Sequence, residues 1–249
     1  MAFSIALAGK GGTGKTTMAG FLVKYLLGHH KTPVLAVDAD SNSNLNEVLG
    51  VAVTDTVGNA REDMKKGVVP SGMTKDVFMS MKLEQAVSES DGFDLIVMGR
   101  PEGSGCYCAA NSLLVGFLEK LVDNYTYIVM DNEAGMEHVS RLTTKNVNLL
   151  LLISDPSRRG LQAALRINEL TRELNIGVGK SYVIINQVKE PPSAEVLKLI
   201  ADAGVELAGT VPEDRMVYDF DYKGRPTIQM PDTSPCVQAA FAIFDQIVP

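Results

Sequence analysis

The chain has 249 residues, of which 45% are hydrophobic and 21% charged, and its net charge is −7 at pH 7. That length suits one domain with a substantial core, and the acidic balance without a Lys/Arg-rich segment argues against binding to nucleic acid or anionic lipid. No apolar run approaches the roughly 18 residues of a membrane span, and the first residues lack a signal-peptide pattern. We therefore expect a cytoplasmic protein.

Apolar runs alternate with helical patterns along the whole chain. The runs predict strands over residues 3–8, 34–37, 95–98, 127–130, 149–153, 182–185 and 205–210. Helical spacing of apolar residues predicts helices over residues 16–27, 109–121, 161–174, 194–203 and 236–247. The alternation predicts one α/β domain over residues 1–249, with a mostly parallel sheet of seven to eight strands and helices on both faces. Residues 54–91 are polar and broken by Gly and Pro, which is typical of an irregular region or an insertion over the active site.

The first strand-to-helix junction carries a phosphate-binding motif. Residues 9–16 follow the P-loop spacing G-x-x-x-x-G-K-T between a predicted strand and a predicted helix. Such a loop directs backbone N–H groups and the positive end of a helix at one point, which suits a triphosphate. We expect the side chain of Lys15 to reach the β- and γ-phosphates and the hydroxyl of Thr16 to bind Mg²⁺. The expected nucleotide-binding residues here are Gly11, Gly12, Thr13, Gly14, Lys15, Thr16 and Thr17.

Lys10 is the unusual residue of this loop, because it places a second positive charge where an ordinary P-loop accepts almost any residue. Ligands of parallel sheets bind beyond the carboxyl ends of the strands, so the other strand ends are the places where further site residues are expected. Asp38 and Asp40 follow the second predicted strand, and such carboxylates could reach Mg²⁺ or position an attacking water. The alternative for Asp40 is a helix N-cap.

Cys106 and Cys108 follow the third predicted strand, one residue apart. In an extended segment alternate residues project from the same face, so both thiolates could meet one soft metal ion such as Zn²⁺ or Ni²⁺. Two thiolates leave a four-coordinate ion half-satisfied, and a two-fold dimer would supply the missing pair. The alternatives are a redox pair or two buried small residues. The third cysteine, Cys236, fits a packing role. An odd number of cysteines in a protein that we expect to be cytoplasmic argues against a disulfide framework.

The later strand ends complete the candidate site. Asp131 ends the fourth predicted strand, as a Mg²⁺-holding Walker B residue would, and Gly135 could turn its N–H toward the γ-phosphate and act as a switch. His138 could be a metal ligand or a relay, but a structural hydrogen bond is the simpler interpretation. Asn186 and Pro212 follow the sixth and seventh predicted strands. We expect both to contact the adenine, with Asn186 offering a donor and an acceptor.

Residues 10–17 resemble the deviant Walker A motif of the MinD/ParA/nitrogenase-iron-protein class of P-loop ATPases. Within that class, three features are similar to the nickel-inserting accessory ATPases of carbon monoxide dehydrogenase and acetyl-CoA synthase, the CooC type. They are Gly-Cys-Tyr-Cys at residues 105–108, Asn111, and Ala-Gly-Met-Glu-His at residues 134–138 after Asp131. The resemblance runs along the whole chain and is thin over residues 54–91.

This resemblance implies a Mg²⁺-dependent ATPase that dimerises with nucleotide and metal, and that loads nickel into a client nickel enzyme. Lys10 would cross to the partner's phosphates, Asp40 would position the attacking water, and Asp38 and Asp131 would serve Mg²⁺. Cys106 and Cys108 from two subunits would hold one Ni²⁺ or Zn²⁺ ion. The first switch lacks the proline that often follows its second Asp in relatives, so no further role is assigned in that loop.

Three other functions compete with this interpretation. A ParA/MinD-type positioning ATPase usually needs a basic face or a basic amphipathic helix, and residues 236–249 contain no Lys or Arg. A nitrogenase-type reductase would need cluster cysteines from two loops, and the second switch has none. A small-molecule kinase would leave Lys10 and the cysteine pair unexplained. No contact with nucleic acid or membrane is expected.

Overall fold

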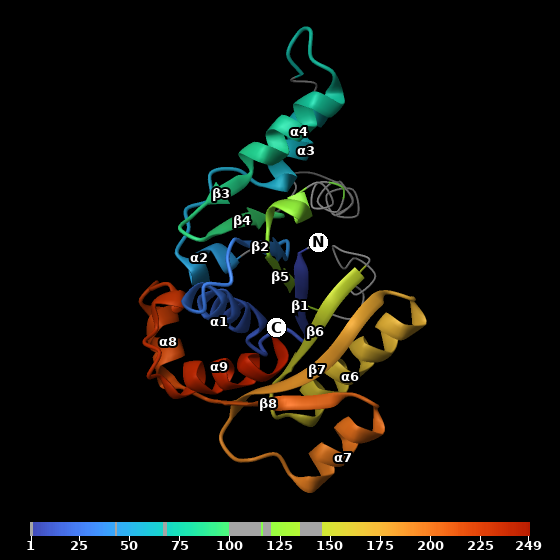
Figure 1. Ribbon diagram of the computed structural model, residues 1–249, viewed down its shortest axis with the longest axis vertical. Helices are drawn as coiled ribbons and strands as arrows, with labels where there is room; N and C mark the ends of the chain where they lie inside the picture. The colour runs from blue at the N-terminus through green and yellow to red at the C-terminus, as the bar shows by residue number, and fades with distance from the viewer. Residues whose placement is uncertain (1, 43, 67–68, 100–115, 117–120, 135–145) are drawn as a thin grey trace.

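The computed structural model describes residues 2–42, 44–66, 69–99, 116, 121–134 and 146–249. Within this part of the chain, eight strands form one sheet in the order β3-β4-β2-β5-β1-β6-β7-β8 (Figure 1). All neighbours are parallel except the edge pair β3 and β4. The strands are β1 (Phe3–Gly9), β2 (Val34–Ala39), β3 (Val87–Glu89), β4 (Phe93–Val97), β5 (Tyr127–Asn132), β6 (Asn146–Ser154), β7 (Gly177–Val188) and β8 (Glu206–Pro212).

β1 lies in the middle of the sheet, between β5 and β6. Its residues alternate between two cores, with Ile5 and Leu7 in one and Ala6 and Ala8 in the other, because a central parallel strand is buried on both faces. The chain reaches β2 on one side of β1 and later crosses to β6 on the other. The loop after β1 therefore lies where the strand order reverses, which is where sheets of this kind bind ligands.

Helices cover both faces of the sheet. One face packs against α1 (Lys15–Gly28), α2 (Leu45–Leu49), α8 (Arg215–Tyr222) and α9 (Pro235–Ile247). The opposite face packs against α3 (Val57–Lys65), α4 (Lys75–Gln85), α6 (Arg158–Glu173) and α7 (Ala194–Asp202). Two short 3₁₀ turns, η1 (Val122–Asn124) and η3 (Thr227–Gln229), complete the described elements. The apolar side of α9 is buried in the core through Cys236, Val237, Ala240, Ile243 and Phe244.

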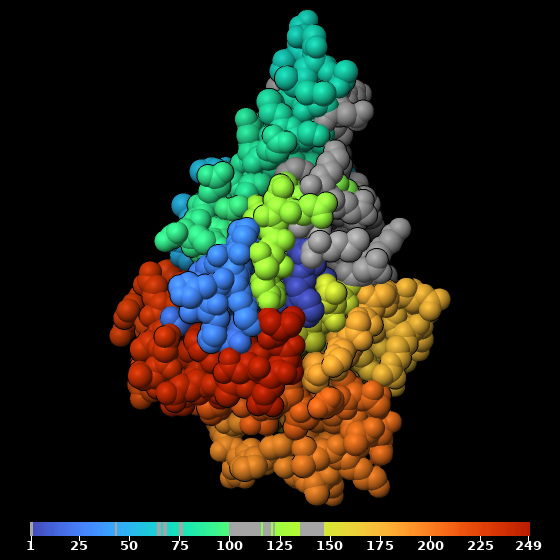
Figure 2. Space-filling view, viewed as in Figure 1, coloured from blue at the N-terminus to red at the C-terminus, as the bar shows by residue number. Residues whose placement is uncertain are grey.

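The stretch 54–91, for which the sequence offered no regular pattern, contains α3, α4 and β3. Val57, Ala60, Met79 and Leu83 anchor the helix pair on the core near the β3–β4 edge. The pair projects beyond that edge as a narrow extension (Figures 1 and 2). In α4, the hydroxyl of Thr74 caps the first turn by accepting from the Val77 N–H at 3.3 Å.

The architecture predicted from the sequence is confirmed. Each of the seven predicted strands is present, and β3 is the eighth. The first and last predicted helices and those at 161–174 and 194–203 correspond to α1, α9, α6 and α7, whereas the helix predicted at 109–121 lies almost entirely outside the described residues. α8 was not predicted. Among the described helices, none has the length and apolarity needed to cross a membrane.

Candidate nucleotide-binding site

The P-loop connects the end of β1 to the start of α1, as the motif predicts. Gly12 and Gly14 have positive φ angles of 81° and 84°, which favour glycine over other residues. A Cβ on Gly9 would lie 2.1 Å from the carbonyl oxygen of Ile153 in the neighbouring strand, so the loop begins at a position with no room for a side chain. The sequence of glycines thus sets the path of the loop.

Lysine and threonine side chains hold this loop from within. The buried hydroxyl of Thr13 donates to the carbonyl oxygen of Lys10 at 2.9 Å, and the Lys15 ammonium donates to the same oxygen at 3.2 Å. Burial lowers the pKa of Lys15, while the nearby carboxylates of Asp131 and Asp40 act in the opposite direction. The side chain of Lys10 is exposed. The loop therefore keeps one lysine inside and presents the other outward.

Asp131 lies beside the first turn of α1, inside the end of β5 rather than beyond it. It is 1% exposed, its carboxyl is hydrogen-bonded to the Thr16 hydroxyl, and its Oδ1 has no hydrogen-bond partner among the described residues. Burial raises the pKa of Asp131 to about 7, and the Asp38 charge adds to the rise. A buried carboxylate oxygen without a partner next to a threonine hydroxyl is the donor chemistry that Mg²⁺ prefers.

Asp38 is paired with Asp131 across the β2–β5 register and is fully buried. Its Oδ1 accepts from the Asp40 N–H at 3.1 Å, and its Oδ2 accepts from the N–H groups of Asn44 and Leu45, both at 3.0 Å. Burial raises the pKa of Asp38 to about 6 even though these bonds favour the carboxylate. The described geometry thus makes Asp38 the anchor of the loop that carries Asp40.

Asp40 stands half-buried at the start of that loop, and its Oδ1 accepts from the Asn42 N–H at 2.8 Å. It is close enough to Lys15 for its charge to influence the pKa of that lysine. The loop reaches across to the end of β5, where the Ser41 hydroxyl donates to Glu133 at 3.4 Å. The loops after β1, β2 and β5 therefore converge, as the three strand ends predict.

The carboxyl end of β7 holds the P-loop from the other side. The buried Asn186 donates from Nδ2 to the Thr13 carbonyl oxygen at 2.9 Å, and Gln187 donates from Nε2 to the Gly12 carbonyl oxygen at 3.2 Å. A Cβ on Gly14 would lie 2.4 Å from the Asn186 nitrogen. The adenine contact predicted for Asn186 stays a prediction; the structure places its amide nitrogen on the phosphate-binding loop. Gln187 was missed, although it also stands at a strand end.

A cavity of about 430 Å³ adjoins the first turn of α1. Gly14, Thr17, Asn186 and Pro212 line it, so the structure brings together these residues of the predicted site. Tyr218, on the unpredicted helix α8, lines the cavity as well. Asp214 caps the start of α8 by accepting from the Met216 N–H at 2.9 Å. A capping residue before a segment rich in aromatic residues is the sequence signal that could have predicted this helix. The cavity has the size of a small-molecule site.

Several predicted residues lie outside the described part of the chain: Cys106, Cys108, Asn111, Gly135 and His138. Among the described residues there is no group of three or more His, Cys, Asp and Glu side chains placed to hold a metal ion. Cys236 is 2% exposed within the core, in agreement with the predicted packing role.

The family model described as the CobQ/CobB/MinD/ParA nucleotide binding domain matches residues 4–228. The chain belongs to this family. It is a family of P-loop ATPases, which agrees with the loop, the buried lysine and the strand-end carboxylates described above. The resemblance to the MinD/ParA class, noted on the motif alone, is thereby confirmed at the level of the family.

Individual relatives extend this comparison. An uncharacterised ATP-binding protein of Methanocaldococcus jannaschii is 40% identical over 248 residues, covering 98% of both chains. The carbon monoxide dehydrogenase accessory protein CooC of Rhodospirillum rubrum is 31% identical over 255 aligned positions, covering 96% of this chain and 94% of its own. The solved structure of the septum site-determining protein MinD of Pyrococcus horikoshii, complexed with Mg-ADP, aligns with a TM-score of 0.73 at 22% identity. The alignment covers 100% of this chain and 96% of that one, and it shows that the two share a fold.

Proposed function

We propose that this chain is an ATP-hydrolysing metallochaperone that dimerises with nucleotide and delivers nickel to a client nickel enzyme, carbon monoxide dehydrogenase or acetyl-CoA synthase. The similarity to CooC over nearly the full length of both chains carries this proposal. The Cys-Tyr-Cys sequence at residues 106–108 and the exposed Lys10 support it, because the proposal gives each of them a role.

The proposed ATPase site uses groups that are already in place. Lys15 would exchange its bond to the Lys10 carbonyl oxygen for the β- and γ-phosphate oxygens of ATP. Thr16 and Asp131 would hold Mg²⁺, whose charge would neutralise the phosphates. This assignment is supported by the Asp131 Oδ1, which has no hydrogen-bond partner in the described part of the chain. Asp38 would keep the first switch loop in position rather than bind the ion. Asp40 would orient the attacking water.

Lys10 supports the dimer. Its ammonium is exposed, while its own loop uses only its carbonyl oxygen. A second protomer docked over the P-loop would place this charge near the partner's phosphates, where it would stabilise the closed dimer as long as the γ-phosphate is present. Hydrolysis would remove that contact and open the dimer. Opening would change the distance between the thiolates that the two subunits share, so the affinity for the metal would depend on the bound nucleotide.

The metal site is tested by replacing both thiols. We expect Cys106→Ser with Cys108→Ser to abolish about one bound metal per dimer, because the soft ligands are lost. Elemental analysis after gel filtration measures the metal, and Cys236→Ala is the matched control because Cys236 lies in the core. Metal content equal to that of the wild type in the double variant would refute a shared thiolate site.

A positioning ATPase of the MinD/ParA kind is the second candidate, since solved MinD and ParA structures share this fold. Such a protein would bind membrane or DNA in its ATP state. The apolar side of α9 is occupied by the core, which does not favour a membrane role for that helix. ATP-dependent sedimentation with anionic vesicles or with DNA, together with metal-independent dimerisation, would favour this candidate instead.

A further inference from the structure

The segments that follow β2 and β5 leave the sheet side by side. The two strands are parallel neighbours, with Ala39 opposite Asn132. Residues 40–42 belong to the first switch loop and begin with Asp40, which would orient the attacking water. Residues 132–134, here called the second switch segment, follow the strand end that would hold Mg²⁺. A contact between these two segments therefore joins the two halves of the proposed hydrolytic site.

Ser41 occupies a fixed position in the first switch loop. On one side of it, the Asp40 N–H donates to Asp38 at 3.1 Å, and on the other the Asn42 N–H donates to Asp40 at 2.8 Å. Ser41 is only 8% exposed. A hydroxyl at such a place has little access to water, so it needs a partner within the protein.

The second switch segment is held against the strand and the loop that bind phosphate. The buried amide of Asn132 donates to the Leu7 carbonyl oxygen in β1 at 3.0 Å. A Cβ on Gly11 would lie 3.7 Å from the Ala134 Cβ, which is an ordinary contact distance. Glu133 thus stands between a residue tied to β1 and a residue beside the P-loop.

One side-chain hydrogen bond joins Ser41 to Glu133. The Ser41 hydroxyl donates to Oε1 of Glu133 at 3.4 Å. This distance is long for an O–H···O bond, which is typically about 2.7–2.8 Å. A small approach of the two segments would strengthen the bond, and a small separation would break it. A hydrogen bond of this length is therefore sensitive to the relative position of the two segments.

We propose that Ser41 and Glu133 link the two switch segments, so that ATP bound at the P-loop fixes Asp40 in its reactive position. Ser41 is then a positioning residue, because it acts through the neighbouring Asp40 rather than on the nucleotide. The link rests on the ATPase function proposed above. Since the link orders the hydrolytic site and does not hold ATP, its loss lowers kcat and leaves KM unchanged.

A double-mutant cycle on ATP hydrolysis tests the link. Ser41→Ala removes the donor and Glu133→Ala removes the acceptor. Each should lower kcat about fivefold, as expected for one hydrogen bond, with KM for ATP within about twofold of the wild type. The double variant should also lose about fivefold, rather than the roughly 25-fold of independent effects. Independent effects, or a wild-type kcat in Ser41→Ala, would overturn the link.

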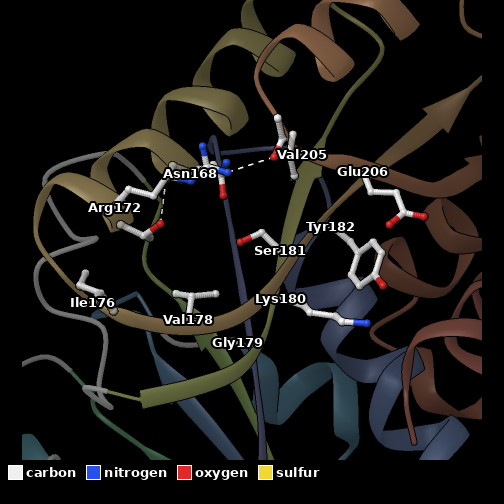
Figure 3. A pocket seen from close by; sticks show the side chains of 12 residues that line it. Asn168, Arg172, Ile176, Val178, Gly179, Lys180, Ser181, Tyr182, Val205 and Glu206 are labelled. Atoms are coloured by element: carbon white, nitrogen blue, oxygen red, sulfur yellow. Dashed lines mark hydrogen bonds between the residues drawn. The ribbon is translucent and has the colours of Figure 1, made fainter.

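A conservative variant and two controls sharpen the test. Glu133→Gln keeps an acceptor of the same length and should retain kcat within about twofold; a loss as large as that in Glu133→Ala would overturn the link. Asn42→Ala, at an exposed neighbour, is the near control. Lys180→Gln is the remote control, because Lys180 lies in the first half of β7, its side chain directed away from the cavity beside it (Figure 3). A fivefold loss in either control would overturn the assignment to Ser41.

Two further readouts separate the possible failures. Melting temperatures of the Ser41 and Glu133 variants should stay within about 3 °C of the wild type. A larger fall together with a raised KM would identify a purely structural contact and overturn the positioning role. A wild-type chain without ATP turnover would overturn the proposed function and the link together, whereas independent effects in an active protein would overturn the link alone.

Discussion

Asp131 is a carboxyl with only 1% exposure, and it makes the stability of the nucleotide-free protein depend on pH. Burial raises the pKa of Asp131 to about 7, above the roughly 3.9 of an unfolded Asp. Between these values the folded chain binds the additional proton, so stability falls as the pH rises through this window. Above pH 7 the buried carboxyl is charged in the folded protein, so its desolvation lowers the free energy of unfolding by its full amount.

Asp131→Asn should therefore raise the melting temperature of the metal-free protein at pH 8 by about 3 °C or more, and the difference should shrink at pH 5. The same variant should lose the additional stabilisation that Mg²⁺ gives in the presence of ATP, because a charged oxygen ligand is gone. Thermal melts in chelator and in Mg-ATP measure both effects. An unchanged or lower melting temperature at pH 8 in chelator would contradict the raised pKa of this buried carboxyl.

Asp40 is tested by a change that preserves its shape. Asp40→Asn should slow ATP hydrolysis about a hundredfold while the ATP-bound dimer persists, since a positioned carboxylate in such a role contributes at least that factor. Asn42→Ala is the matched control, because only the backbone N–H of Asn42 contacts Asp40 in the described structure. Phosphate release and gel filtration measure the two properties, and wild-type turnover in the Asp40 variant would remove this residue from the mechanism.

At the scale of elements, the end of β7 fixes the shape of the P-loop. Asn186→Ala should lower ATP affinity about tenfold, because the Thr13 carbonyl oxygen loses a buried donor and the loop becomes less ordered. Gln187→Ala removes an exposed and longer bond, so its effect should stay within about threefold. Isothermal titration with a slowly hydrolysed ATP analogue compares the two. Equal losses of ATP affinity in both variants would indicate that the burial of the hydrogen bond from Asn186 to Thr13 is unimportant.

The sequence predicts those elements that are defined by residues close to one another along the chain. Buried parallel strands are continuous apolar runs, and the P-loop is defined by its own glycines, so β1, its loop and α1 could be placed from the residues alone. The tether from Asn186 to Thr13 joins residues 173 positions apart, and no local pattern reveals such a contact. The three backbone N–H groups that donate to Asp38 lie, by contrast, only two to seven positions further along the chain, so this anchor is local, and the Mg²⁺ role expected of Asp38 stays a prediction.

The elements that sequence reasoning missed share a physical cause. α3 and α4 bury only a few apolar residues at the edge of the sheet, so their helical period is weak in a polar segment. β3 has three residues and pairs with β4 alone, which leaves it too short for a periodic signal. α8 is half-exposed and carries the solvent-facing Tyr218 and Tyr222, 64% and 78% exposed, so its apolar face is narrow.

At the scale of the whole molecule, the proposed function depends on the assembly of two copies of the chain. Each chain carries its own P-loop, yet the exposed Lys10 and the two thiols at residues 106 and 108 find their proposed use only in a second copy. ATP would close the dimer, and hydrolysis would open it. Nucleotide state, oligomeric state and metal content should therefore change together.

Light scattering during gel filtration, with elemental analysis of the same peak, tests this claim most directly. Protein loaded with nickel is run without nucleotide, with ADP, and with a non-hydrolysable ATP analogue. We predict that the ATP analogue gives a dimer of 26.8-kDa protomers carrying about one metal ion per dimer, and that Lys10→Ala binds the analogue but stays monomeric. A wild-type monomer with the analogue and nickel, or a Lys10→Ala variant that still dimerises, would contradict the account.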